Sequence, residues 1–208
     1  MAYPPPHHQE EQFENALFLV QQAPLATLIS TKDNEVLCTH TPLVHQANNE
    51  FGVLVGHLDK FNPQCQHFAT AREVTCIFHG PDVYISPSVY STTQLPTWNY
   101  FKVHMKGTLT LVNDREAIKQ SLIDMTAFLE GNDPKYTLEA DNPRMDRALE
   151  YIVGFRIEVT HWEGKYKISQ DKRKTDQLLA KEALLDQGEA YTSLIEQLYS
   201  HHQTKSAQ

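Results

Sequence analysis

The chain has 208 residues, enough for one domain with a substantial hydrophobic core. Its 18 Lys and Arg residues against 26 Asp and Glu residues give a net charge of −8, which excludes general electrostatic attraction of the whole surface to nucleic acids or anionic membranes. Three scattered cysteines, Cys38, Cys65 and Cys76, argue against a disulfide framework and favour a reducing, cytoplasmic environment. The opening residues lack the features of an export signal, and no apolar run is long enough to span a membrane.

The first half of the chain combines one helix with several short strands. Apolar residues on one helical face predict an amphipathic helix at residues 9–22, and the Asp33–Asn34 turn signal between two β-rich runs predicts a hairpin. Strands are expected at residues 23–30, 36–46, 51–58 and 73–79. A short helix over residues 64–72 follows Pro63, whose ring suits the start of a helix.

The second half predicts longer strands with two intervening helices. Strands are expected at residues 83–86, 98–112, 151–162 and 165–169. The last two are separated by an expected turn at Glu163–Gly164. Asn113 or Asp114 is expected to cap a helix that Gly131 ends, and a short helix follows at residues 144–150.

Many short strands, few helices and no regular β-α-β alternation predict a mainly β fold with flanking helices, an antiparallel barrel. The helical pattern that begins at Lys172 breaks at Gly188. Residues 191–199 then form an apolar stripe, which either the barrel or another subunit must cover. We therefore expect a barrel domain at residues 1–170 and a C-terminal helical extension at residues 171–208.

Two segments have the composition of a ligand site. Residues 79–107 are rich in aromatic rings, prolines and small polar side chains, which fits an aromatic rim around a flat ligand and equally fits an aromatic core hairpin. The turn at residues 56–63 follows a strand and precedes a helix, so its backbone donors, with Lys60 and Asn62, fit a phosphate. The alternative is an ordinary strand-to-helix turn that Asn62 caps.

The histidines lack metal-binding spacing and no nucleophile motif frames the serines, so we predict no metal site and assign no catalytic residue. Four single histidines are predicted to lie on strands: His40, His57, His79 and His104. Each is interpreted as a hydrogen-bonded interior or rim residue, with an axial haem ligand as the alternative. The pairs His7–His8 and His201–His202 are interpreted as tails.

An ordered series of motifs runs through most of the chain. Its members are Tyr3-Pro4-Pro5, Thr39-His40-Thr41-Pro42, Gly56-His57 with Asn62-Pro63, Gly80-Pro81 with Tyr84-Ile85-Ser86-Pro87-Ser88 and Tyr90, Pro96-Thr97-Trp98-Asn99-Tyr100, Val103-His104 with Gly107, and Lys167-Ile168-Ser169-Gln170. Together they resemble the PaiB family of FMN-binding negative transcriptional regulators. The resemblance implies the split-barrel fold of flavin-binding proteins, FMN as cofactor, and a homodimer with flavin sites at the subunit interface.

The resemblance also implies a set of cofactor-binding residues. They are Thr39, His40, His57, Lys60, Asn62, Trp98, Asn99, Tyr100, His104, Lys167, Ser169 and Gln170. Lys60 stands where the family usually has Arg and would keep a positive charge for the FMN phosphate. Asp59, Asp82 and Val89 depart from the usual residues of the family, and the two carboxylates would weaken phosphate binding.

These features lead to one main functional hypothesis and two alternatives. We expect an FMN-binding split-barrel protein of the PaiB type that acts as a negative transcriptional regulator. The alternatives are a flavin-dependent oxidoreductase that uses NADH or NADPH, and a haem-binding split-barrel protein. Because the net charge is −8 and no helix-turn-helix with a basic face is evident, we expect the regulation to be indirect rather than through DNA contact.

Overall fold

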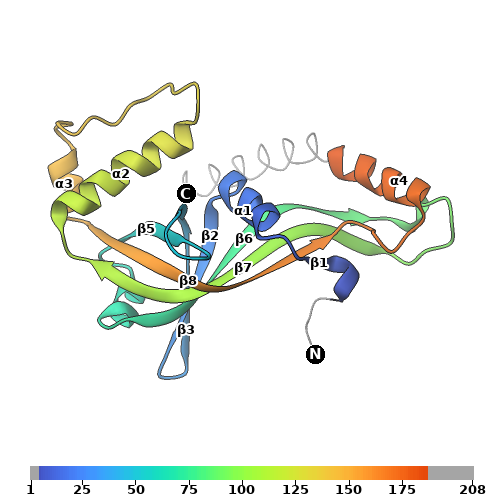
Figure 1. Cartoon of the computed structure of the whole chain (residues 1–208), viewed down its shortest axis with the longest axis horizontal. Helices are drawn as coiled ribbons and strands as arrows, with labels where there is room; N and C mark the ends of the chain where they lie inside the picture. Colours follow the sequence, from blue (N-terminus) through green and yellow to red (C-terminus); the bar gives the residue numbers. More distant parts are fainter. Residues whose placement is uncertain (1–4, 187–208) are drawn as a thin grey trace, which may run out of the picture. The chain divides into compact units, whose positions relative to one another are not determined.

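The structure, a computed structural model, describes residues 5–186 and is built around one eight-stranded sheet. The strand order is β3-β2-β6-β7-β8-β5-β4, with β1 paired to β8 (Figure 1). The strands are β1 (Gln9–Glu10), β2 (Leu25–Lys32), β3 (Glu35–Pro42), β4 (Val44–Gln46), β5 (Val53–Asp59), β6 (Arg72–Ile85), β7 (Thr97–Val112) and β8 (Ile152–Lys167). The helices are η1 (Pro6–His8), α1 (Phe13–Gln22), η2 (Pro63–Phe68), η3 (Pro87–Val89), α2 (Arg115–Glu130), α3 (Met145–Leu149) and α4 (Lys174–Leu185).

The chain forms two compact units, and β6, β7 and β8 each contribute to both. The barrel unit consists of Glu10–His79 and Lys102–Gly164. The α4 unit consists of Gly80–Phe101 with the described residues of the segments 1–9 and 165–208. Within residues 5–186, no helix is both long and apolar enough to cross a membrane.

The barrel unit has an apolar core made by alternation along its strands. In β2, Ala26, Leu28 and Ser30 are buried while the intervening Thr27 and Ile29 are partly exposed, as expected for a strand with one face on the core. β2 pairs with β3 on one side and with β6 on the other. The turn between β2 and β3 has positive φ angles at Asp33 and Asn34, a conformation that suits a two-residue hairpin. The predicted hairpin is therefore confirmed.

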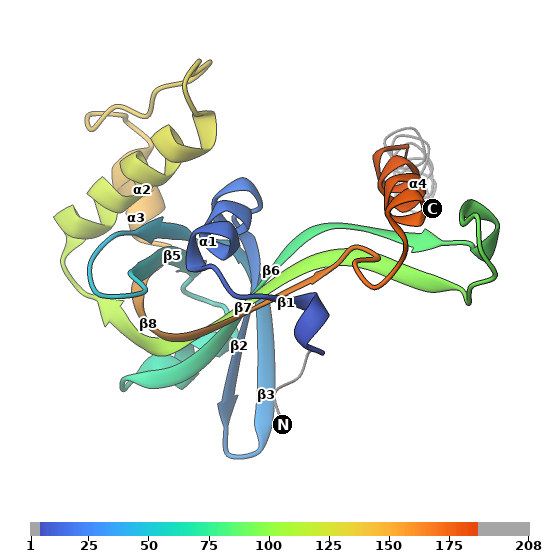
Figure 2. The same ribbon diagram turned by 45° about the vertical axis from the view of Figure 1, so that its right-hand side comes forward.

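In the α4 unit, one helix covers one face of three strand ends. Figures 1 and 2 show α4 lying across the ends of β6 and β7. Val83, Ile85 and Tyr90 pack with Ala180 of α4 into a buried apolar cluster, and Leu184 packs against its edge. Since Val83 and Ile85 point to α4, the intervening Tyr84 points to the opposite face of the sheet.

Several local predictions are confirmed by the structure. Asp114 caps α2, because its side chain accepts a hydrogen bond from the backbone N–H of Glu116, and Gly131 ends the helix with a φ of 70°. Asn62 caps η2 in the same way, through the N–H of Gln64. The helix predicted at 9–22 begins later, at Phe13, because residues 9–10 form β1 and pair with β8. Gly188 and residues 191–199 lie outside the described residues.

Two predicted strand breaks are wrong. Gly80 and Pro81 do not divide β6, because β2 pairs with β6 only as far as Phe78, and beyond it Pro81 needs no hydrogen-bond partner on that edge. The turn expected at Glu163–Gly164 is absent, because β8 is continuous there. Gly164 has a packing reason instead: a Cβ at this position would lie 2.8 Å from Cβ of Glu10.

Candidate functional site

Thr39 and Asn62 are brought together inside the barrel unit. The side-chain amide of Asn62 donates to the Thr39 hydroxyl at 2.9 Å, while its oxygen accepts the capping bond from Gln64 at the same distance. Thr39 stands opposite Leu28 in the β2–β3 register, which places both on the core side of the hairpin. The pair therefore fixes η2 to β3, and its polar atoms are already engaged.

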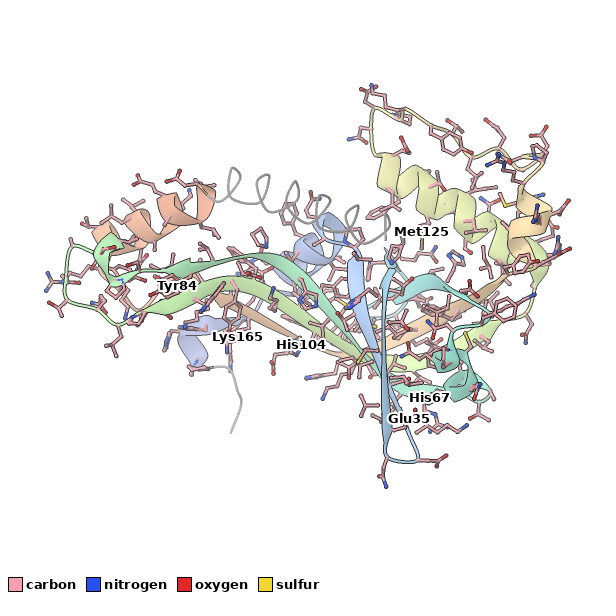
Figure 3. The ribbon with its side chains drawn as sticks, turned by 180° about the vertical axis from the view of Figure 1, so that it is seen from behind. Glu35, His67, Tyr84, His104, Met125 and Lys165 are labelled. Atoms are coloured by element: carbon pink, nitrogen blue, oxygen red, sulfur yellow. The ribbon has the colours of Figure 1, made fainter. Side chains whose placement is uncertain are left out.

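His40 points to the opposite face of the same hairpin. Its Nδ1 lies 3.1 Å from the Thr27 hydroxyl, which lies 3.0 Å from Nε2 of His79 on β6. The three side chains form a polar row across β3, β2 and β6 on the solvent side. His104, labelled in Figure 3, is partly exposed between the buried residues Val103 and Met105, so it too faces away from the core.

His57 turns towards α2 rather than towards the other predicted cofactor residues. Its Nε2 lies 2.7 Å from the hydroxyl of Ser121. Burial lowers the pKa of His57 from 6.5 to about 4, so the imidazole is neutral at physiological pH. A neutral, hydrogen-bonded imidazole in this position adds no positive charge for a phosphate.

Lys60 is held by groups of the barrel unit itself. Its Nζ donates to the backbone oxygen of Glu150 at 2.6 Å and lies 4.4 Å from the ring centre of Tyr151. The neighbouring backbone donors are also engaged, since the N–H of Phe61 donates to Oδ1 of Asp59 at 2.8 Å and that of Asn62 to the Asp59 backbone oxygen at 2.9 Å. A phosphate in this turn would have to displace the carboxylate of Asp59. The phosphate role of Lys60 stays a prediction.

The α4 unit carries an exposed aromatic face, which consists of Tyr84, Trp98, Tyr100 and Lys165. Trp98 is 53% exposed and meets Tyr84 edge to face, with ring centres 6.1 Å apart. Tyr100 lies two residues further along β7 on the same side, and Nζ of Lys165 lies 5.4 Å from its ring centre. Figure 3 labels Tyr84 and Lys165. Asp82 shares this face by alternation with Tyr84.

Asn99 points to the other side of β7, where it joins a buried polar network. Its amide nitrogen donates to the Ser169 hydroxyl at 3.1 Å, and that hydroxyl lies 2.9 Å from the Tyr90 hydroxyl. Lys167 donates to the hydroxyl of Thr97, and the Gln170 side chain donates to the backbone oxygen of Tyr166. Of these residues, Thr97, Asn99, Lys167 and Ser169 border a cavity of about 350 Å³.

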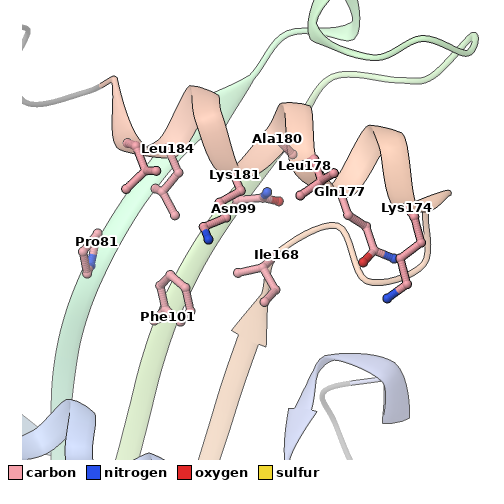
Figure 4. A pocket seen from close by; sticks show the side chains of 11 residues that line it. Pro81, Asn99, Phe101, Ile168, Lys174, Gln177, Leu178, Ala180, Lys181 and Leu184 are labelled. Carbon is pink, nitrogen blue, oxygen red and sulfur yellow. The ribbon is translucent and has the colours of Figure 1, made fainter.

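A second, larger cavity lies beneath α4, with a volume of about 760 Å³ (Figure 4). Pro81, Phe101, Ile168 and Leu184 form apolar parts of its wall. Figure 4 shows the Lys181 side chain reaching from α4 towards the strands. Asn99, Lys174, Gln177 and Lys181 add polar and cationic groups to the same wall. The cavity therefore offers apolar surface together with a few hydrogen-bond donors and positive charges.

The predicted cofactor residues thus fall into several groups rather than one. In the barrel unit they are Thr39 with Asn62, His40, His57, Lys60 and His104; in the α4 unit they are Trp98 with Tyr100, and Asn99 with Lys167, Ser169 and Gln170. The aromatic face also contains Tyr84 and Lys165, which are not among the predicted cofactor residues. Strand alternation along β6 and β7 could have placed Tyr84 on the same face as Trp98 and Tyr100. No sequence signal pointed to Lys165. Among residues 5–186, no group of three or more potential metal ligands occurs.

Comparison with known proteins gives the family. A family described as "Putative FMN-binding domain" matches residues 2–161. The protease synthase and sporulation protein PAI 2 of Bacillus subtilis is 28% identical over 207 residues, which cover 99% of this chain and 93% of that protein. An uncharacterised protein of Emericella nidulans is 23% identical over 81% of this chain and 84% of its own length.

Solved structures agree on the fold. An FAD- and haem-binding protein from Mycobacterium smegmatis superposes with a TM-score of 0.61 at 15% identity, covering 83% of this chain and 80% of that one. A conserved hypothetical protein from Mycobacterium tuberculosis gives a TM-score of 0.58 at 15% identity, covering 83% and 94%. The predicted mainly antiparallel split barrel with flanking helices is confirmed. The chain belongs to this FMN-binding domain family, as the PaiB-type motif series predicted.

Proposed function

We propose that the protein binds FMN on the aromatic face of the α4 unit. Family membership supports the cofactor, and the observation that carries the location is the exposed Trp98 packed against Tyr84, with Lys165 over Tyr100 on the same side. Aromatic faces stack on planar rings, and an ammonium group attracts a phosphate. The cavity beneath α4 also has ammonium groups, those of Lys174 and Lys181, but Phe101 is the one aromatic ring among its described lining residues.

The donor set of this face fits FMN. Tyr84, Trp98 and Tyr100 supply ring surfaces for the isoalloxazine, and Lys165 supplies a positive charge for the phosphate. Bound FMN would supply redox chemistry, since the flavin accepts a hydride or single electrons. The chain's own contribution would be to orient the ring and to shield one of its faces from water. Of the twelve cofactor positions that the family resemblance implies, Trp98 and Tyr100 belong to this face. The other ten stay predictions outside this proposal.

FMN titration of the purified protein tests the proposal directly. We expect flavin fluorescence to change on binding, and we expect Trp98→Ala to weaken binding by about 5- to 150-fold, since stacking of a planar base on one aromatic ring contributes about 1–3 kcal/mol. Phe18→Ala is the matched control, because Phe18 is an exposed aromatic residue of α1 in the barrel unit. Equal FMN affinity of Trp98→Ala and Phe18→Ala would refute the location, and absence of FMN binding to the wild type would refute the cofactor.

Asp82 provides a second test of the same face. Its carboxylate shares the face of Tyr84 and would repel the phosphate of a flavin bound there. We expect Asp82→Asn to increase FMN affinity by a few fold, since one partly exposed charge contributes up to about 1 kcal/mol. The gain should be absent with riboflavin, which has no phosphate. A gain of the same size with both flavins would contradict the assigned orientation.

We further propose that the protein is a homodimeric, flavin-linked negative regulator that acts without direct DNA contact. The relation to PAI 2 and the net charge of −8 support this assignment. The exposed apolar residues Leu25 and Val36 on β2 and β3 support a subunit contact, and three free thiols support a cytoplasmic setting. Sedimentation would test the dimer. Sequence-specific DNA binding that persists at moderate salt in a gel-shift series would contradict the indirect mode.

The two alternative activities are separated by spectra of the same sample. Loss of flavin visible absorbance after addition of NADH or NADPH would support a flavin-dependent oxidoreductase. A Soret band after haem titration would support the haem-binding alternative.

A further inference from the structure

One flank of α4 carries a row of apolar and basic side chains along the cavity of about 760 Å³. The row consists of Lys174, Leu178, Lys181 and Leu185, whose spacing in sequence puts them on one face of a helix. Leu178 is 62% exposed and Leu185 is 69% exposed. The contact that holds α4 on the sheet lies on another side of the helix, where Ala180 is buried. The row is therefore not used by the packing of α4 itself.

The strands beside α4 supply an apolar floor for the same cavity. Phe101 of β7 and Ile168, which follows β8, both line it, and Figure 4 shows their side chains on the side of the strands that carries α4. Among the described residues, α4 buries Val83 and Ile85 of β6, whereas Phe101 and Ile168 stay partly exposed. The cavity is thus a groove with an apolar floor and a mixed apolar and basic wall. Its volume lies within the range of about 300–1,000 Å³ that is typical of ligand pockets, so it has room for several side chains.

The sequence that follows α4 has an apolar stripe that matches this groove. Residues 187–208 lie outside the part of the chain that the structure describes. In the sequence, Gly188 breaks the helical pattern, and an apolar stripe follows that consists of Tyr191, Leu194, Ile195, Leu198 and Tyr199. Such a stripe needs a cover, because large apolar patches on the surface of a protein are unfavourable in water. The groove and the stripe are therefore two apolar surfaces that lie close together in the sequence.

Reach and length favour the stripe of the same chain as the occupant of the groove. Leu185 lines the groove, and residues 187–190 follow it at once, enough for the short loop of about 2–5 residues that joins two antiparallel helices. At about 1.5 Å per helical residue, the row on α4 is roughly 16 Å long and residues 191–199 would span roughly 12 Å. A segment tethered by a short linker acts at an effective concentration of about millimolar, which favours it over a second copy of the chain.

Charge favours the same occupant. Lys174 and Lys181 lie in the row on α4, and neither has an acidic residue three or four positions away within that helix. The charged residues between positions 187 and 204 are Glu189 and Glu196, both acidic. The segment and the groove therefore carry opposite charges, which attract one another.

We propose that residues 191–199 turn back at Gly188 and bind in the groove of their own chain as a second helix antiparallel to α4. The apolar stripe would pack on Phe101, Ile168 and the two leucines of the row. A layer of two helices over one face of a sheet is a common arrangement, because each element then buries its apolar side. The proposal does not rest on FMN binding, since Phe101 and Trp98 point to opposite sides of β7.

Binding of the dye ANS tests whether the segment covers the groove. ANS combines aromatic rings with a sulfonate and fluoresces on exposed apolar surface. We expect a chain that ends at Asp186 to give several-fold more ANS fluorescence than the full chain and to melt several degrees lower. Leu194→Glu should reproduce most of the gain, whereas Ser193→Glu, with the same charge off the stripe, is the matched control and should resemble the wild type. Equal ANS fluorescence of the full and shortened chains would show a groove open to external ligands and would overturn the proposal.

A disulfide cross-link in the full chain identifies the occupant, and it applies even where the shortened chain does not fold. Leu178 and Leu198 are equally far from Gly188 in sequence, so an antiparallel pair that turns there brings them together. We expect Leu178→Cys with Leu198→Cys to form, on mild oxidation, a link within one chain that migrates as a monomer in a non-reducing gel. Leu178→Cys with Gln197→Cys, off the stripe, is the control for the native thiols and should link much less. A link between two chains would assign the groove to a second copy, and equal yields of both pairs would exclude a defined contact; either result refutes the proposal.

Discussion

Replacement of His57 by Gln should remove a specific part of the pH dependence of stability. His57 lies on β5 and its Nε2 lies 2.7 Å from the Ser121 hydroxyl on α2. Burial lowers its pKa from 6.5 to about 4, so the folded state binds the proton more weakly than the unfolded state. The wild type therefore keeps its full stability above about pH 6.5 and loses stability as the pH falls towards 4. Below pH 4 no further loss comes from this residue.

The size of the effect follows from the shift. A pKa that falls from 6.5 to about 4 corresponds to a change of at most about 3 kcal/mol in the free energy of unfolding, and partial solvent access to His57 reduces this change to about 2 kcal/mol. Gln keeps a side-chain N–H for the Ser121 hydroxyl and does not titrate.

Urea unfolding of both proteins, followed by circular dichroism between pH 7 and 4.5, gives the free energy of unfolding at each pH. Because both proteins contain the same carboxylates, the difference between their two pH profiles of unfolding free energy reports on His57. Parallel profiles of His57→Gln and wild type would refute the assignment of a buried neutral imidazole.

Three other substitutions test packing and capping. Gly107→Ala should cost about 1–3 kcal/mol in urea unfolding, because a Cβ would collide with the backbone oxygen of Glu158, whereas Thr108→Ala should cost less. Asn62→Ala should cost about 0.5–2 kcal/mol through loss of the η2 cap, and Asn62→Asp should recover most of it, since Asp caps but cannot donate to Thr39; equal losses would contradict the capping role. Asp176→Asn should lower the melting temperature, because the carboxylate accepts bonds from Thr92 and from the side chain and backbone of Ser91. These bonds, that from Thr92 first, lower the pKa of Asp176, so the wild-type advantage should persist above pH 3.8 and disappear as the pH falls further.

Local signals in the sequence predicted local structure well where one or two residues decide the conformation. Asp33 and Asn34 tolerate positive φ, so the hairpin turn follows from their identity. Gly131 ends α2 for the same reason. Gly80–Pro81 and Glu163–Gly164 carry equally strong break signals, yet β6 and β8 continue through them. At Gly80–Pro81 the strand continues because the edge of β6 beyond Phe78 is not paired with β2. At Gly164 the glycine is explained by the close approach of Glu10 of β1. Both are tertiary features that the local sequence does not encode.

The candidate site was predictable in composition but not in arrangement. The resemblance implies that Trp98, Asn99 and Tyr100 all bind the cofactor, although alternation on a strand sends Asn99 to the opposite side from its neighbours. His8 is only 6% exposed, so the interpretation of His7–His8 as a tail is wrong for this residue. No local signal predicted this, because a histidine beside a proline-rich opening is usually exposed. Its burial depends on how residues 5–9 pack within the α4 unit, which no local pattern encodes.

The distribution of positive charge decides where an anionic ligand can bind. At the turn after β5, Asp59 occupies the N–H of Phe61, and Lys60 is committed to the backbone of Glu150 and the ring of Tyr151. An incoming phosphate there must break these contacts and face a carboxylate at close range. In the α4 unit, Lys165 and Lys167 lie near one another beside His8, while Lys172 is paired with Asp171 at 2.8 Å. Because the chain as a whole carries a charge of −8, we expect this local pair of lysines to favour an acidic ligand at the α4 unit over the turn after β5.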